Sequence, residues 1–212
     1  GIPIEIVGTA SDGKEALALI KKENPNLVFL DIEMPGMSGI DFLKQFLPSH
    51  PLPVILVSSL NLRVFDALAA GAVDFVRKPD AVESRESFLQ ALTHKIIVAS
   101  HARLSRANLP HPAAPAAQLR FGGDGAPEQT VIGLGASTGG TEATLNVLRR
   151  LPANIPGMVI VQHMPVGFTK MYAERLNRLC QMEVREAVNG DEIRPGLALV
   201  APADYQAKVV RM

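Results

Sequence analysis

Short apolar runs alternate with longer amphipathic stretches along most of the chain. The short runs are typical of buried strands, and the stretches with apolar residues every three or four positions are typical of helices. Regular alternation of the two favours parallel α/β architecture. The pattern predicts strands at residues 4–7, 27–30, 54–57, 74–76, 158–161, 183–188 and 197–200, and helices at 13–23, 40–47, 64–70, 84–104, 141–151 and 169–181.

The alternation stops between residues 105 and 130, where four prolines and a Gly-Gly pair occur without sustained periodicity. That composition is typical of a semi-flexible tether. The chain of 212 residues is long enough for two small domains. We therefore expect one domain over residues 1–104, a linker over 105–130 and a second domain over 131–212.

Composition narrows the classes of function. The 47% apolar content is ample for buried cores, and the 21 basic residues balance the 21 acidic ones. With equal numbers of basic and acidic residues, the chain has no net positive charge that would attract nucleic acid or an anionic membrane. A single cysteine, Cys180, excludes an internal disulfide and a cysteine-rich zinc site. No apolar run is long enough to span a bilayer, so we expect a cytoplasmic protein without membrane insertion.

Three polar residues of different chemistry follow successive strands of the first block. Asp31, Ser58 and Lys78 each stand at or just past the end of a predicted strand. Open α/β sheets bind ligands outside the carboxyl ends of their strands. Any one of the three alone would be a solvated loop residue, but three together predict a crevice. A carboxylate, a hydroxyl and an ammonium there could accept and stabilise a phosphoryl group.

Residues 31–39, Asp-Ile-Glu-Met-Pro-Gly-Met-Ser-Gly, resemble the phosphoacceptor loop of two-component receiver domains, and Ser58 and the Lys78-Pro79 pair match that family's signature. The resemblance implies a flavodoxin-like fold in which Asp31 takes a phosphoryl group from a histidine kinase. Lys78 would pair with Asp31, and Ser58 would donate to a phosphate oxygen. Phe75 stands at the position of the family's aromatic switch residue.

The receiver resemblance also implies a Mg²⁺ site and a cis Lys78–Pro79 peptide bond. Asp31 and the backbone carbonyl of Glu33 would hold the ion. The family's first strand ends in an acidic pair that helps to bind Mg²⁺, and no such pair precedes residue 4. We therefore expect a receiver domain that lacks its first strand and is incomplete at the N-terminus.

In the second block, residues 131–140 read Val-Ile-Gly-Leu-Gly-Ala-Ser-Thr-Gly-Gly, and residues 135–139 fit G-x-S-x-G. Such a strand-to-helix turn exposes its serine, here Ser137, and aims backbone N–H groups at a developing oxyanion. The serine could instead cap the helix. His163 follows the next predicted strand, where it could act as the base for Ser137, although a lone histidine is ordinarily structural.

A dinucleotide-binding turn is the competing interpretation of the same glycines. The fingerprint G-x-G-x-x-G needs glycine where Thr138 stands, and it needs an acidic residue where Gln162 and His163 stand. Both departures disfavour a dehydrogenase. Downstream, Cys180 aligns with the apolar face of the last predicted helix, so we expect it to be a core residue.

Gly-Ala-Ser-Thr-Gly-Gly, Val-Gln-His-Met-Pro, Gly-Phe-Thr-Lys-Met-Tyr-Ala-Glu-Arg-Leu and Gly-Asp-Glu-Ile-Arg-Pro-Gly resemble the effector domain of chemotaxis protein-glutamate methylesterases. The resemblance implies a parallel α/β serine esterase without a cofactor. Ser137 would be the nucleophile, His163 the base and the Thr138 backbone N–H an oxyanion donor. The implied substrates are glutamyl γ-methyl esters and glutamines of chemoreceptors, hydrolysed by a phosphorylation-gated enzyme that is expected to be a monomer.

That family's third triad residue is an aspartate nearer the C-terminus, beyond Met212, so we expect an esterase domain incomplete at its C-terminus. The chain as given is then expected to be inactive and poorly folded by itself. The alternative is a receiver fused to a non-catalytic esterase-like docking domain. A DNA-binding output is disfavoured because no basic recognition helix is visible.

Overall fold

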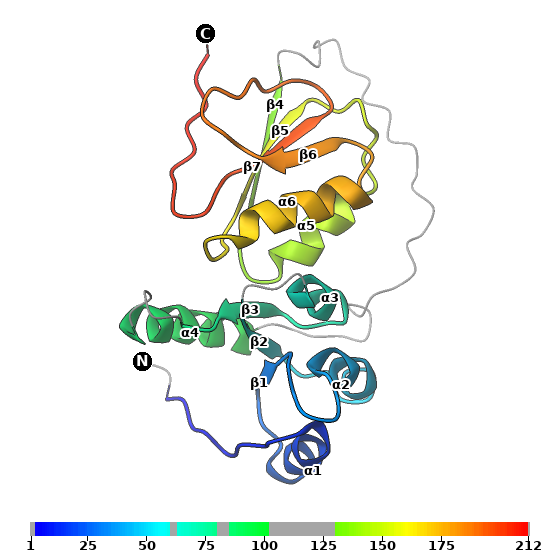
Figure 1. Cartoon of the computed structure of the whole chain (residues 1–212), viewed down its shortest axis with the longest axis vertical. Helices are drawn as coiled ribbons and strands as arrows, with labels where there is room; N and C mark the ends of the chain where they lie inside the picture. The colour runs from blue at the N-terminus through cyan, green and yellow to red at the C-terminus, as the bar shows by residue number, and fades with distance from the viewer. Residues whose placement is uncertain (1–2, 60–62, 80–84, 102–129, 212) are drawn as a thin grey trace. The chain divides into compact units, whose positions relative to one another are not determined.

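The computed structural model describes residues 3–59, 63–79, 85–101 and 130–211 (Figure 1). The chain divides into two compact units, Gly1–Pro112 and Ala113–Met212. The predicted linker over residues 105–130 lies, except for its last residue, outside the described residues. None of the helices in the described ranges is long and apolar enough to cross a membrane.

The first unit is built on three parallel strands in the order β1-β2-β3. Figure 1 shows α2 and α3 on one side of this sheet and α4 on the other. The elements are α1 (Gly13–Glu23), β1 (Val28–Asp31), α2 (Gly39–Phe46), β2 (Val54–Ser58), α3 (Arg63–Ala69), β3 (Asp74–Arg77) and α4 (Arg85–Ser100).

Strand β2 supplies the centre of this unit because it is buried on both faces. Val54, Ile55 and Leu56 are fully buried, and Ile55 packs with Val76 of β3 and Ala99 of α4. A central parallel strand covered on both sides is expected to be apolar at successive positions. The apolar run at residues 54–57 fits the place of β2 in the middle of the described sheet.

The prediction of a strand at residues 4–7 is wrong. The described chain has no strand there, and the side chains are exposed, with Ile6 81% accessible. An apolar run becomes a strand only when a neighbour accepts its backbone hydrogen bonds, and no described strand lies beside β1 on that edge. The expected cis Lys78–Pro79 bond is also wrong: it is trans, the isomer that the peptide bond itself favours.

The second unit has four parallel strands in the order β4-β5-β7-β6. Figure 1 shows α5 and α6 lying on the same side of this sheet. The elements are β4 (Val131–Ala136), α5 (Gly140–Leu148), β5 (Gly157–Gln162), α6 (Phe168–Leu179), β6 (Glu183–Glu186) and β7 (Leu197–Val200).

Helix α6 buries one face against β6 and β7. Phe168, Tyr172 and Leu176 are fully buried along this face, as the four-residue spacing predicts. Cys180 was expected to continue the face, but the helix ends at Leu179 and Cys180 is its half-buried cap. Burial raises the pKa of the Cys180 thiol to about 11, so the group is a neutral thiol at neutral pH.

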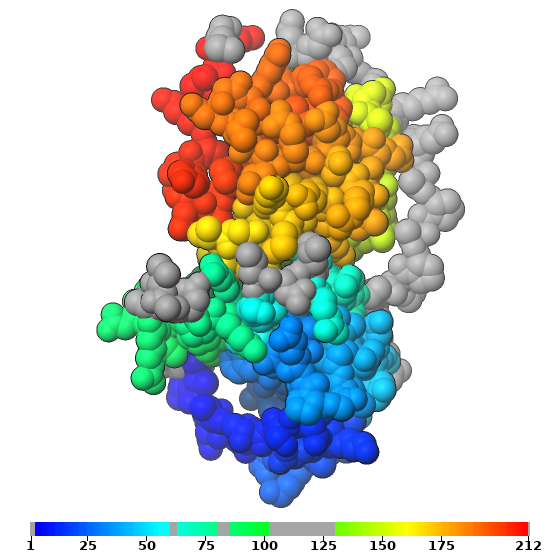
Figure 2. Space-filling model, in the orientation of Figure 1, coloured from blue at the N-terminus to red at the C-terminus, as the bar shows by residue number. Residues whose placement is uncertain are grey.

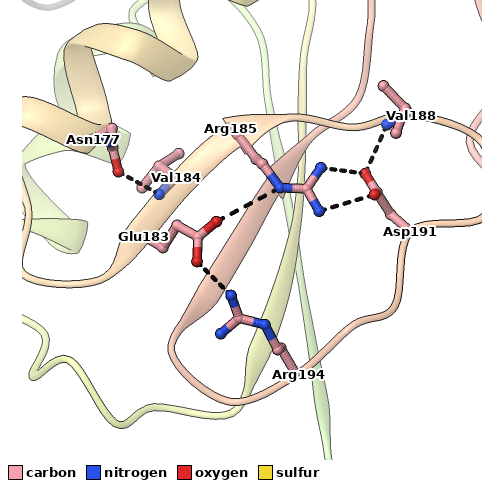
Figure 3. A network of polar contacts seen from close by, with 7 residues as sticks. All are labelled: Asn177, Glu183, Val184, Arg185, Val188, Asp191 and Arg194. Atoms are coloured by element: carbon pink, nitrogen blue, oxygen red, sulfur yellow. Dashed lines mark hydrogen bonds and ion pairs between the residues drawn. The ribbon is translucent and has the colours of Figure 1, made fainter.

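Side chains cover the edge strand β6, as Figure 3 shows. Asn177 of α6 accepts a hydrogen bond from the Val184 N–H, a donor that no strand satisfies. Arg185 donates two hydrogen bonds to Asp191, which also accepts the Val188 N–H. The bond from Arg185 lowers the pKa of Asp191. Figure 2 shows this orange segment on the outer surface of the unit.

Candidate functional site

The first candidate site lies at the carboxyl ends of β1, β2 and β3. Asp31 is the last residue of β1, Ser58 is the last of β2, and Lys78 directly follows β3. The Lys78 Nζ lies 2.5 Å from Asp31 Oδ2. Asp31 Oδ1 accepts the Glu33 N–H at 3.1 Å. The predicted carboxylate–ammonium pair is therefore formed, and it is open to solvent, with the side chains 37% and 41% exposed.

The structure does not bring the Ser58 hydroxyl to Asp31. The Ser58 Oγ donates to the Ser59 carbonyl at 3.0 Å, and the side chain is buried. The Ser58 carbonyl accepts the Lys78 N–H at 2.7 Å. The backbone of Ser58 thus positions Lys78, while its hydroxyl would have to rotate to meet a phosphoryl group on Asp31.

Phe75 is buried in β3 rather than lying at the surface. The residue before it, Asp74, faces α4, where Lys95 Nζ lies 2.8 Å from Asp74 Oδ2 and 5.9 Å from the centre of the Phe75 ring. The contact is an ion pair, and Asp74 Oδ2 accepts no hydrogen bond from the described residues. Both charged side chains are buried, and the sequence analysis did not identify this pair.

The second candidate site lies at the carboxyl ends of β4 and β5. These strands pair in register, with Ala136 opposite Gln162. Ser137 and His163 are the next residue on each strand, and the His163 N–H donates to the Ala136 carbonyl at 3.0 Å. Both residues are exposed. Adjacent strands lie about 4.8 Å apart, so the predicted nucleophile and base are neighbours at one edge.

The turn after Ser137 leads directly into α5. Gly139 has a φ of 76°, a left-handed conformation that glycine adopts readily. The Gly140 N–H donates to the Ser137 carbonyl at 2.8 Å, and a Cβ on Gly140 would lie 2.6 Å from the Ala136 Cβ. The helix therefore starts close against β4. Thr138 lies inside this turn, where the partial positive charge of the helix N-terminus favours an anion.

Side chains from α6 hold this helix start. The Tyr172 hydroxyl donates to the Thr141 carbonyl at 3.2 Å, and burial raises the pKa of Tyr172 so that it stays a phenol. Arg175 forms an ion pair of 2.7 Å with Glu142 in the first turn of α5. The sequence analysis did not find these contacts, because they join residues about thirty positions apart.

Gln162 is the other residue that the sequence analysis missed. Its side chain is buried, and its Nε2 donates to the carbonyls of Ser137, at 2.9 Å, and His163, at 3.3 Å. In the sequence, Gln162 indicates only that a dinucleotide site is disfavoured. Its contacts with both turns depend on the pairing of β4 and β5, which no local pattern shows.

The residues predicted to hold Mg²⁺ are Asp31, the last residue of β1, and Glu33 through its backbone carbonyl. Within the part of the chain that the structure describes, no group of three or more acidic, histidine or cysteine residues gathers. Mg²⁺ is often bound through one or two carboxylates while it keeps several waters, so a carboxylate and a carbonyl suit the ion.

Two protein families account for most of the chain. Residues 3–90 match the response regulator receiver domain, and residues 132–211 match the CheB methylesterase. The two matches occur in the order predicted from the sequence. They correspond to the two units of the fold.

The curated relatives are named for two hydrolytic activities. A protein-glutamate methylesterase/protein-glutamine glutaminase 2 of Syntrophomonas wolfei is 48% identical over 208 residues, covering 97% of this chain and 60% of the relative. The protein of the same name from Pseudomonas aeruginosa is 44% identical over 216 residues, with coverage of 98% and 60%. The chain thus spans about 60% of the length of these relatives.

Solved structures from Thermotoga maritima are also similar. The CheB response regulator domain is 36% identical, with a TM-score of 0.43 and coverage of 47% of this chain and 79% of that one. The CheB methylesterase catalytic domain is 40% identical, with a TM-score of 0.35 and coverage of 37% and 44%.

Proposed function

Because the chain joins a response regulator receiver domain to a CheB methylesterase domain, we propose that it is a phosphorylation-regulated hydrolase of glutamyl γ-methyl esters on chemoreceptors. It also deamidates receptor glutamines. The names of the relatives support this activity over a non-catalytic docking domain. The domains span residues 1–104 and 131–212, with a linker over 105–130.

The observation that carries the proposal is the register of β4 and β5, which makes Ser137 and His163 neighbours. Ser137 Oγ attacks the ester carbonyl carbon while His163 takes the hydroxyl proton. The Thr138 N–H donates to the resulting oxyanion. The C–O bond then breaks, and methanol leaves with the proton from His163. Water hydrolyses the acyl-serine to restore the glutamate and Ser137; with glutamine the leaving group is ammonia.

The receiver domain controls this reaction through Asp31. A phosphohistidine of the chemotaxis histidine kinase gives its phosphoryl group to an Asp31 oxygen, so a P–N bond breaks and a P–O bond forms. Asp31 and the Glu33 carbonyl would hold Mg²⁺, which would neutralise the charge of the phosphoryl group. Lys78, already paired with Asp31, then contacts the phosphoryl oxygens. Ser58 donates to one of them, and Phe75 takes part in the switch.

The proposal also includes the partners, the location and the oligomeric state of the protein. The partners are methyl-accepting chemoreceptors and the histidine kinase, the protein is a cytoplasmic monomer, and it binds no nucleic acid. The esterase reaction needs no cofactor. The balance of 21 basic and 21 acidic residues supports protein partners over a polyanion.

Methanol release from methylated receptor membranes tests the function. The native-length protein is measured with and without a small phosphodonor, beside Ser137→Ala. We expect release that rises with the phosphodonor and falls at least about 10³-fold in the variant. Release that ignores the phosphodonor would contradict the regulation, and no release from folded wild-type protein would favour the docking domain.

A further inference from the structure

Gln162 links the two turns that carry the proposed nucleophile and base. It is the last residue of β5, lies opposite Ala136 in the ladder, and is only 6% exposed. One Nε2 group reaches both the Ser137 and His163 carbonyls. Both neighbours of Nε2 are acceptors, so the amide nitrogen must face them.

The hydrogen bond from Gln162 to the Ser137 carbonyl fixes the orientation of the whole Ser137–Thr138 peptide. The peptide unit between Ser137 and Thr138 is planar and trans, so its C=O and its N–H point in opposite directions. When the Ser137 carbonyl is directed inward at Gln162 and Gly140, the Thr138 N–H is directed away from them. Gln162 thereby determines the orientation of the group proposed to hold the oxyanion.

This peptide needs an external constraint. It lies in the turn between β4 and α5, where no strand ladder fixes its orientation. A flipped peptide would present a carbonyl to the oxyanion instead of an N–H. Among the described residues, the Gly140 N–H and the Gln162 amide donate to the Ser137 carbonyl, and Gln162 lies on the neighbouring strand β5.

Gln162 is poorly explained by stability alone. Its Oε1 is buried and has no hydrogen-bond partner among the residues that the structure describes. It lies 2.5 Å from the position that a Cβ on Gly140 would occupy. A buried acceptor without a partner costs free energy, and a methionine of similar size would avoid that cost. The donor end of the amide is therefore the useful part.

We propose that Gln162 is a positioning residue that locks the Ser137–Thr138 peptide with the Thr138 N–H facing the reacting carbonyl, and that also restrains the His163 turn. The inference rests on the proposed function. Gln162 itself does not contact the substrate. Its effect is on transition-state stabilisation, so kcat changes and KM does not.

The test compares Gln162→Met and Gln162→Glu with wild type in the intact protein. The first readout is the rate at which a fluorophosphonate labels Ser137, which needs the oxyanion donor but no receptor. The second is kcat and KM for methanol release. For Gln162→Met we expect labelling and kcat to fall about 10- to 100-fold, with KM within about twofold and an unchanged melting temperature.

Gln162→Glu adds a pH readout. The ionised carboxylate cannot donate and repels both carbonyls, whereas the protonated acid can donate one hydrogen bond. The labelling rate of this variant relative to wild type is therefore expected to rise as the pH falls. Asn177→Leu is the matched control, because it also removes a side-chain amide bonded to a backbone group, on β6 rather than β5. Its labelling rate should equal that of wild type.

Labelling of Gln162→Met within twofold of wild type would overturn the inference, as would an equal loss in Asn177→Leu. Wild-type protein that labels at Ser137 but releases no methanol would refute the proposed function, and the labelling rates would still decide the role of Gln162. Absence of Ser137 labelling in folded wild type would overturn both.

Discussion

The two candidate sites lie at the same place in two parallel sheets, but their side chains are held differently. In the first unit, Asp31 and Lys78 come from strands separated by β2 and bind each other directly. In the second unit, Ser137 and His163 follow adjacent strands, and a third residue, Gln162, binds the backbone of both. An ion pair holds Asp31 and Lys78 together, whereas the register of β4 and β5 places Ser137 beside His163.

The length of the side chains explains the difference. Two strand spacings amount to about 9.6 Å, which a long lysine can bridge to a carboxylate. Serine and histidine are shorter, so their strands must be neighbours. A charged pair also tolerates variation in geometry better than a nucleophile, whose misplacement by about 1 Å can cost 10²-fold in rate. A buried residue that holds the backbone, such as Gln162, is therefore useful only in the second site.

Asp31→Asn tests whether the first site acts through one carboxylate. An amide is not a phosphoryl acceptor, so we expect complete loss of phosphoryl incorporation from a small phosphodonor. The measurement is intact-protein mass spectrometry, and Asp41→Asn, at the first turn of α2, is the control. Incorporation that persists in Asp31→Asn would place the acceptor elsewhere.

His163→Gln tests whether strand register alone supplies the base. General base catalysis contributes about 10²–10⁴-fold, so methanol release should fall by that factor. The side chain is exposed, and the melting temperature should stay unchanged. Glu174→Gln, on the exposed face of α6, should keep wild-type activity. A loss below about tenfold would mean that another group accepts the serine proton.

Two lysine–aspartate pairs in the first unit sharpen the contrast between a functional and a structural ion pair. Lys95→Met leaves the Asp74 carboxylate buried without its cation, which is expected to cost about 3–5 kcal/mol in the free energy of unfolding. Lys78→Met breaks an exposed pair and should cost about 0–1 kcal/mol.

Denaturation in urea, followed by circular dichroism, measures both costs. The double variant Asp74→Asn/Lys95→Met should recover much of the loss, because no buried charge remains. Equal effects of Lys78→Met and Lys95→Met would show that burial does not separate the two pairs.

Asp191→Asn gives the smallest expected effect, because this network binds a surface loop to β6 and not to the site. The bond from Arg185 lowers the pKa of Asp191, so its contribution is present above the unfolded value of about 3.9. It is lost as the pH falls through the lowered folded pKa. The variant should melt slightly below wild type at pH 7, and the two melting temperatures should converge as the pH falls below the lowered pKa of Asp191. A difference that grew on acidification would contradict this assignment.

The sequence predicted those parts of the sites that depend on the ends of strands. Asp31, Ser58 and Lys78 could be placed at one edge because each follows an apolar run, and the same reasoning placed Ser137 near His163. It did not predict that the Ser58 hydroxyl is turned to Ser59, since a rotamer depends on local packing. The prediction of a strand at residues 4–7 failed because strand formation depends on a neighbouring strand as well as on an apolar run of residues.

The order of elements, the boundaries of most helices and the chemistry at the strand ends were determined by the sequence alone, because periodicity and turn residues act locally. Only the tertiary structure decided which strands are neighbours, and with that the pairing of Asp74 with Lys95 and the contacts of Gln162 with two turns. The Asp74–Lys95 pair and the Gln162–Ser137 bond join residues that are 21 and 25 positions apart. No local pattern encodes a long-range contact, since its free energy comes from the packing of whole elements against one another.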